Sequence, residues 1–111
     1  MELIETSTFT RQINALLNDE EYREFQSRIA ANSTLGALIR GGGGIRKVRV
    51  AVGSRGTSGG ARVIYYWAAR KDVILFLYAY AKSRAADLTP QQVSQLAKVV
   101  RKEFAGEKGD V

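Results

Sequence analysis

Basic side chains interrupt segments of the sequence that otherwise have the composition of β-strands. Lys47 and Arg49 lie two positions apart in "IRKVRVAV", and Arg62 is the second residue of "ARVIYYW". Lys82 follows the apolar run "VILFLYAYA". Because an unpaired buried charge is very costly, these side chains are expected on an open face of a sheet. No carboxylate on these strands balances them, which indicates a face that binds an anion.

The composition excludes several kinds of catalytic site. There is no cysteine and no histidine, so thiolate nucleophiles, Cys-based zinc sites and acid–base catalysis by imidazole are excluded. An enzyme with this sequence must use Lys, Arg, Tyr, Asp or Glu. The glycine run 41–44 is not a phosphate-binding loop, because no Gly-Lys-Ser/Thr follows it and it precedes a strand. No metal-ligand spacing is present, and we expect neither a metal nor another cofactor.

The positive charge belongs to the middle of the chain. The net charge is +6 and the isoelectric point is about 9.9. Residues 35–84 contain ten basic side chains and a single acidic one, Asp72, whereas residues 1–34 contain three basic and six acidic ones. This asymmetry favours a polyanionic partner for the central segment.

Aromatic residues are interleaved with the basic ones, a pattern typical of single-stranded RNA binding. Strand alternation places Tyr66 on the face of Arg62, and it places Tyr80, Tyr78 and Phe76 in line with Lys82. We therefore expect the rings of Tyr66 and Tyr80 to contact RNA. Arg55, in the glycine-rich hairpin "GSRGTSGG", is expected to reach a phosphate.

The order of expected elements is β-α-α-β-β-β-α, which predicts an α+β fold with a curved antiparallel sheet and helices mainly on one face. Strands are expected at 2–8, 44–52, 61–68 and 73–81. Asn18 with Glu21, and Thr89 with Gln92, have the spacing of capping boxes at the start of two helices. The segment 32–44 is expected to be a connecting loop.

The chain has the length of one small domain, 1–111, with 106–111 expected to be a frayed tail. Its longest apolar run is too short to span a membrane. No charged region followed by an apolar one opens the sequence, so no secretory signal is expected. We expect a cytoplasmic protein with no membrane partner.

Several segments together resemble the RelE/HigB superfamily of bacterial toxin–antitoxin toxins, and most of all its HigB-like branch. They are "LGALIRGGGGIRKVRVA", the glycine hairpin, "ARVIYYW" and "LYAYAKSRAADLTPQQ". With the order of elements, the resemblance covers roughly residues 20–100. It implies the small RelE-like fold and a metal-independent endoribonuclease that cuts translated mRNA in the ribosomal A site and so inhibits translation and growth.

The resemblance also implies the chemistry. The 2′-hydroxyl of the substrate attacks the adjacent phosphate, and the protein supplies cations and proton transfer. The family's site residues fall on Lys47, Arg49, Arg62 and Lys82. Arginine stays protonated, so Arg49 and Arg62 are expected to clamp the phosphate. Neighbouring cations favour the neutral form of a lysine, so Lys47 or Lys82 could transfer protons, and the sequence does not separate them.

The expected partners are a helix-turn-helix antitoxin, the ribosome and mRNA, with operator DNA bound only indirectly through the antitoxin complex. The sequence departs from the family after the fourth strand, where Ser83 and Arg84 replace the common Asn-Glu. Arg84 adds charge beside the expected site, and we expect it to contact RNA.

Two alternatives stay open: a ParE-like toxin that inhibits DNA gyrase without cutting RNA, and a non-catalytic nucleic-acid-binding module. The first has no need of the four basic residues, whereas the second requires only the charge distribution.

Overall fold

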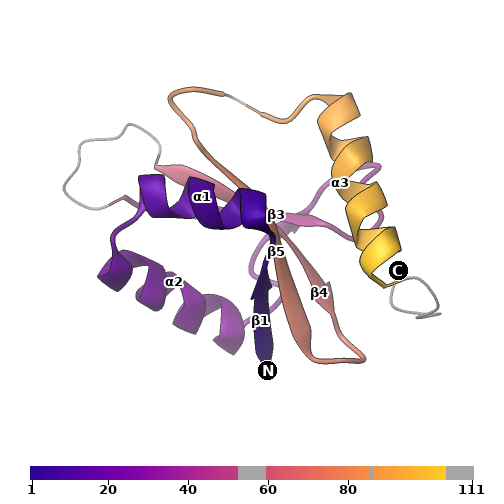
Figure 1. The fold of residues 1–111 in the computed structure, drawn as a ribbon, viewed down its shortest axis with the longest axis horizontal. Coiled ribbons are helices and arrows are strands. Elements are labelled where there is room, and N and C mark those ends of the chain that lie inside the picture. The colour runs from indigo at the N-terminus through magenta and orange to yellow at the C-terminus, as the bar shows by residue number, and fades with distance from the viewer. Residues whose placement is uncertain (53–59, 86, 105–111) are drawn as a thin grey trace.

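A computed structural model describes residues 1–52, 60–85 and 87–104. Eight elements follow one another along the chain (Figure 1). They are β1 (Glu2–Glu5), α1 (Ser7–Leu16), α2 (Asp19–Ala31), β2 (Ala37–Leu38), β3 (Arg46–Val50), β4 (Ala61–Ala68), β5 (Val73–Ala81) and α3 (Pro90–Glu103). The α+β class predicted from the sequence is confirmed.

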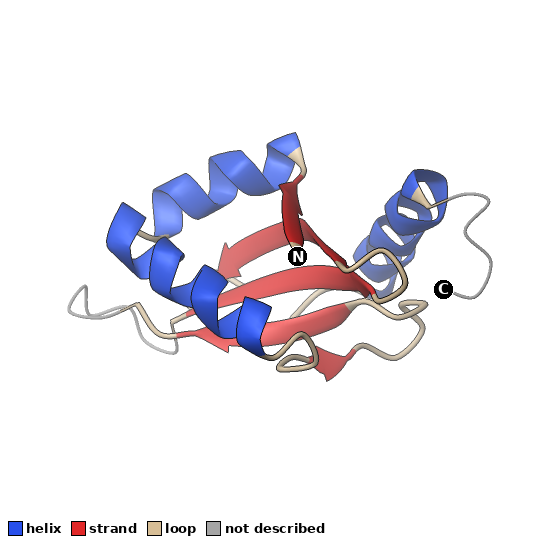
Figure 2. Cartoon of the chain, turned by 90° about the horizontal axis from the view of Figure 1, so that it is seen from below, coloured by secondary structure: helices blue, strands red, loops and turns tan. Residues whose placement is uncertain are grey.

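The strands form one curved sheet in the order β1-β5-β4-β3-β2. The helices lie on both of its faces: α1 and α2 pack on one, and α3 packs on the other (Figure 2). The sheet differs from the expected one in three respects. The first strand ends at Glu5 rather than at residue 8, because α1 begins at Ser7. β1 pairs with β5 in parallel, and β2 is a short additional edge strand in the segment expected to be a loop.

Each face of the sheet carries its own hydrophobic core, because β4 and β5 are apolar on both sides. Nearly continuous apolar runs are typical of strands that are covered on both faces. One core joins the sheet to α1 and α2, and the other joins it to α3. Central members of the first are Phe9, Ile13, Phe25, Val63 and Phe76. Central members of the second are Ile64, Tyr66, Leu77, Val100 and Phe104.

A β-bulge in β5 changes which side chains share a face. Ile64 lies opposite Tyr78, whereas the next residue, Tyr65, lies opposite Phe76. One residue of β5 is therefore left without a partner in β4, and the alternation of side chains reverses there. The expectation that Phe76 lies in line with Tyr78 and Tyr80 is wrong. Its ring lies on the other face, stacked on Phe9 with 5.0 Å between ring centroids.

The helix boundaries follow the predicted caps. The Asn18 side chain accepts a hydrogen bond from the Glu21 backbone, and the Glu21 carboxylate accepts one from the Asn18 backbone. Thr89 and Gln92 make the same reciprocal pair at the start of α3, where Pro90 is the first helical residue. Caps of this kind satisfy backbone donors that a helix leaves unpaired. The two capping boxes thereby determine where α2 and α3 begin.

The segment that contains β2 is held against the sheet by the hydroxyl of Tyr65. This hydroxyl donates a 2.8 Å hydrogen bond to the carbonyl of Ser33 and accepts a 2.9 Å bond from the backbone of Gly36. A Cβ atom at Gly36 would lie 2.8 Å from the carbonyl oxygen of Lys47. Only glycine allows this close approach of the segment to β3.

Within the described residues, no helix combines the length and the apolar character that crossing a membrane requires. The tail 106–111 and the tip of the glycine hairpin, 53–59, lie outside the described residues.

A carboxylate on β1 joins both N-terminal helices to the sheet. Glu5 accepts 2.5 Å hydrogen bonds from the hydroxyls of Thr10 in α1 and Tyr22 in α2. Burial of Tyr22, followed by the hydrogen bond and the negative charge of Glu5, raises the pKa of Tyr22 far above its ordinary value of 10.0. The hydroxyl therefore stays protonated and keeps donating.

Replacing Tyr22 with Phe is expected to lower the free energy of unfolding by about 1.5 kcal/mol, since a hydrogen bond to a charged acceptor is lost. The contribution is complete below pH 10.0 and declines above it, because the unfolded tyrosine then ionises while the folded one does not. Denaturant unfolding measures both effects. Tyr80→Phe is the matched control: among described residues the buried Tyr80 hydroxyl has no hydrogen-bond partner, so its removal is expected to cause no loss and to raise the free energy of unfolding by up to about 1 kcal/mol. Equal losses in both variants would contradict this assignment.

Candidate nucleic-acid interface

The pairing of β3, β4 and β5 brings three polar side chains into one row across the sheet. Arg49 lies opposite Arg62, and Arg62 lies opposite Tyr80. Directly opposed residues of antiparallel strands point to the same face, with Cβ atoms about 4.5–5.5 Å apart. Val48 and Val50 lie on the other face, in the core beneath α1 and α2. The alternation predicted for β3 is therefore confirmed.

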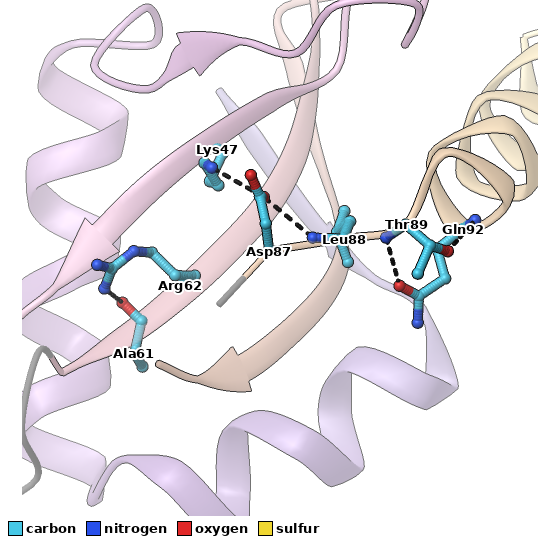
Figure 3. Close-up of polar contacts among 7 residues, drawn as sticks. All are labelled: Lys47, Ala61, Arg62, Asp87, Leu88, Thr89 and Gln92. Carbon is cyan, nitrogen blue, oxygen red and sulfur yellow. Dashed lines mark hydrogen bonds and ion pairs between the residues drawn. The ribbon is translucent and has the colours of Figure 1, made fainter. Parts of the chain in front are cut away.

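The pairing of Arg49 with Arg62 places two positive charges directly opposite each other, which is destabilising in an antiparallel sheet. None of the residues of β3, β4 and β5 is acidic, so no carboxylate on these strands offsets the repulsion. Arg49 is exposed and Arg62 is half-buried, with its guanidinium donating a 3.2 Å hydrogen bond to the neighbouring carbonyl of Ala61 (Figure 3). An anion bound across the pair would relieve the repulsion.

Lys47 and Lys82 lie on either side of this row. Lys47 is on β3, two residues before Arg49, opposite Ile64. Lys82 directly follows β5, and its backbone donates a 3.0 Å hydrogen bond to the carbonyl of Gly60, at the start of β4. Both side chains are partly exposed. The fold thus gathers the four predicted basic residues, here called the cationic face, at one end of the three central strands.

Asp87 is a residue of this site that the sequence reasoning missed. It lies just before α3, and its Oδ1 accepts a 3.0 Å hydrogen bond from Nζ of Lys47 and another from the backbone of Leu88 (Figure 3). The hydrogen bond from Lys47, then that from Leu88 and the charges of Lys47 and Lys82, hold the pKa of Asp87 below its ordinary value. The carboxylate is therefore ionised at neutral pH and faces two of the four cations.

Tyr80 contributes a hydroxyl rather than an open ring. The residue is 8% exposed, and its hydroxyl is buried without a hydrogen-bond partner among the described residues. Burial first, and then the charge of Asp87, raise the pKa of Tyr80, while the charge of Arg62 lowers it. The hydroxyl thus lies in the field of both groups. Its ring has no open face for stacking on a base, contrary to the expectation from sequence.

The other predicted RNA-binding residues do not all join the cationic face. Tyr66 is 2% exposed and packs against Phe104 of α3, with 5.4 Å between ring centroids. Its ring is a core side chain and gives no surface for a base. Arg84 is exposed in the turn after β5 and lines an open groove with Tyr80 and residues of α1. Arg55 lies outside the described residues.

An open groove of about 540 Å³ extends from the cationic face toward β2. Lys47 and Asp87 form part of its wall, and Arg40 adds a further cation. A second pocket, between α2 and the end of β3, is lined by two acidic side chains, Glu21 and Glu24, and one basic side chain, Arg28, so it suits an anion less well. Within the described parts of the chain, no three acidic side chains lie close enough to hold a metal ion.

The family model for the RelE toxin of the RelE/RelB toxin–antitoxin system matches residues 1–109. The chain belongs to the RelE toxin family. It is therefore a toxin of a toxin–antitoxin system, and its partner is an antitoxin. The superfamily predicted from the sequence is confirmed, whereas the HigB-like branch stays a prediction.

The fold of this toxin is similar to that of a solved relative. The structure of E. coli toxin RelE, in a double arginine-to-alanine mutant in the free state, matches with a TM-score of 0.52. The two sequences are 14% identical, and the match covers 89% of this chain and 95% of the other. At this identity the likeness supports the fold and carries no residue roles.

Replacing Arg49 with Gln is expected to raise the free energy of unfolding at low salt by about 0.2–1 kcal/mol, because the repulsion from Arg62 is removed. Sulfate should stabilise the wild type more than this variant, since the paired arginines bind the anion. Unfolding curves over a series of sulfate concentrations measure both effects. Arg23→Gln on α2, where the arginine is exposed on the other side of the sheet, is the matched control. The same sulfate response in both variants would refute an anion site at Arg49.

Proposed function

We propose that this RelE-family toxin is a ribosome-dependent endoribonuclease that cuts translated mRNA in the ribosomal A site. The observation that carries the proposal is the direct opposition of Arg49 and Arg62, flanked by Lys47 and Lys82. Repulsion among these side chains is offset when a phosphate binds, so the face is suited to the backbone of RNA. Membership of a toxin family supports an activity that stops growth.

The proposed reaction needs no nucleophile from the protein. The 2′-oxygen of the message attacks the adjacent phosphorus, the bond to the 5′-oxygen breaks, and the products are a 2′,3′-cyclic phosphate and a 5′-hydroxyl. One proton leaves the 2′-hydroxyl and one reaches the departing 5′-oxygen. Extra negative charge develops on the phosphate oxygens in between, and cations fixed beside them stabilise that charge. The reaction is proposed to proceed without a metal or other cofactor.

The side chains divide between two roles. Arg49 and Arg62 hold the phosphate, since guanidinium groups stay charged and match two phosphate oxygens at once. One of the two lysines, Lys47 or Lys82, is proposed as the proton-transfer group. The hydroxyl of Tyr80 is buried in the field of Arg62 and would have to become exposed before it could donate a hydrogen bond to a bound phosphate.

We propose that the ribosome holds the message in position on the toxin. The cationic face is open, and among the described residues neither Tyr66 nor Tyr80 offers an open ring to hold a base. Ordering of the message by the ribosome would align the 2′-hydroxyl with the phosphate, and such alignment can supply a large part of the rate enhancement. The toxin would act in the cytoplasm and be silenced by a helix-turn-helix antitoxin, whose complex would bind operator DNA.

Replacing Arg62 with Gln is expected to reduce cleavage of translated message by at least about 10²-fold, because a charge beside the reacting phosphate is lost. The measurement is primer extension on a defined mRNA in a reconstituted translation system, with and without ribosomes. The wild type should cut only when ribosomes are present, within A-site codons. Arg23→Gln should cut like the wild type.

Full activity of the Arg62 variant would show that the cationic face is not the active site. Intact message in every reaction, together with growth arrest in cells, would contradict the nuclease and favour a gyrase-directed toxin, for which supercoiling is then assayed.

A further inference from the structure

Among the described residues, a carboxylate from outside the sheet contacts the cationic face. Asp87 belongs to the segment 87–89 that leads into α3, and it reaches Nζ of Lys47 at 3.0 Å. Its charge also acts on Lys82 and on the hydroxyl of Tyr80. A carboxylate oxygen bound to a lysine ammonium occupies the place that a phosphate oxygen would take, because both are anionic acceptors with similar hydrogen-bond geometry.

The contact is weak enough to be exchanged. The side chain of Asp87 is 66% exposed and that of Lys47 is 31% exposed, and an ion pair in such a solvated position contributes little to stability. The hydrogen bond from the Leu88 backbone keeps the carboxylate near the face without burying it. No strand pairing or core packing has to break when the carboxylate leaves Lys47.

We propose that Asp87 is an internal substitute for the RNA phosphate, which occupies Lys47 in the free toxin and must be displaced before RNA binds. This inference rests on the proposed function for the identity of the ligand. Asp87 would thereby set the selectivity of the site. A loosely held RNA in solution competes poorly with a carboxylate attached to the same chain, whereas a message held in place by the ribosome has a high effective concentration.

The alternative role for Asp87 is to orient Lys47 for the reaction, and the two roles have opposite consequences. A positioning carboxylate strengthens binding or catalysis, so its removal weakens them. A competing carboxylate opposes binding, so its removal strengthens it. The position of Asp87 on an exposed connection, rather than on a strand of the rigid sheet, favours competition.

The test is binding of a short single-stranded RNA with 2′-O-methyl riboses, which cannot be cleaved, measured by fluorescence anisotropy on the free toxin at low salt. Asp87→Asn keeps an oxygen that can accept the hydrogen bond from Leu88 but removes the charge. We expect this variant to bind up to about fivefold more tightly than the wild type, in line with the strength of an exposed ion pair. Its affinity should also fall more steeply with salt, because Lys47 becomes free to contact a phosphate.

Two controls separate the proposed contact from a change in net charge. Glu103→Gln removes one negative charge from the exposed end of α3 and should leave the affinity nearly unchanged. In a Lys47→Ala background, Asp87→Asn should change the affinity for RNA very little, since the ammonium group that Asp87 contacts is absent.

Equal or weaker binding by Asp87→Asn would overturn the inference, and so would an equal gain from Glu103→Gln. Because the probe cannot be cut, failure of the proposed nuclease activity would be seen separately, in the primer-extension assay.

Discussion

The pairing of β4 with β3 and β5 fixes the hydrophobic cores and the cationic face together. Side chains of β4 alternate between the core under α1 and α2 and the core under α3. The same register sets Arg62 between Arg49 and Tyr80. A shift by one residue would bury the arginine and expose its apolar neighbours. A change of register that disrupted the site would therefore also lose the free energy gained by burying the two cores.

The sheet is stable despite local features that oppose folding. Opposed arginines and a buried hydroxyl without a described partner each cost on the order of 1 kcal/mol. Burial of a single large apolar side chain contributes about 1.5–3 kcal/mol, and both faces of β4 and β5 hold several of them. The cost is concentrated at the end of the sheet that carries the cationic face, where Tyr80 is part of the core that joins the sheet to α3. Unfavourable arrangements of this kind are expected where a ligand completes the structure.

Local patterns predicted most of the elements and the face of each basic residue on β3 and β4, because caps, alternation and charge are properties of neighbouring residues. Three features could not be read in this way. The parallel pairing of β1 depends on where β5 lies, and the bulge that turns Phe76 away from Tyr80 depends on the fit between β4 and β5. Asp87 stands 40 positions from Lys47, and only the path of the chain into α3 brings them together. A carboxylate just before a predicted helix cap was the available signal.

The position of β1 beside β5 also bears on how the toxin is made. Residues Glu2–Glu5 pair with Val73–Phe76, and the hydroxyl of Thr6 donates a hydrogen bond to the carbonyl of Leu77, 71 positions later. Neither contact can form before β5 has been synthesised. Contacts this distant in sequence form late, because a long loop must close before they can contribute. The first strand, both N-terminal helices and Arg62 on β4 therefore leave the ribosome before β5, the strand that pairs with both β1 and β4. Through most of its synthesis, the nascent chain carries no finished cationic face.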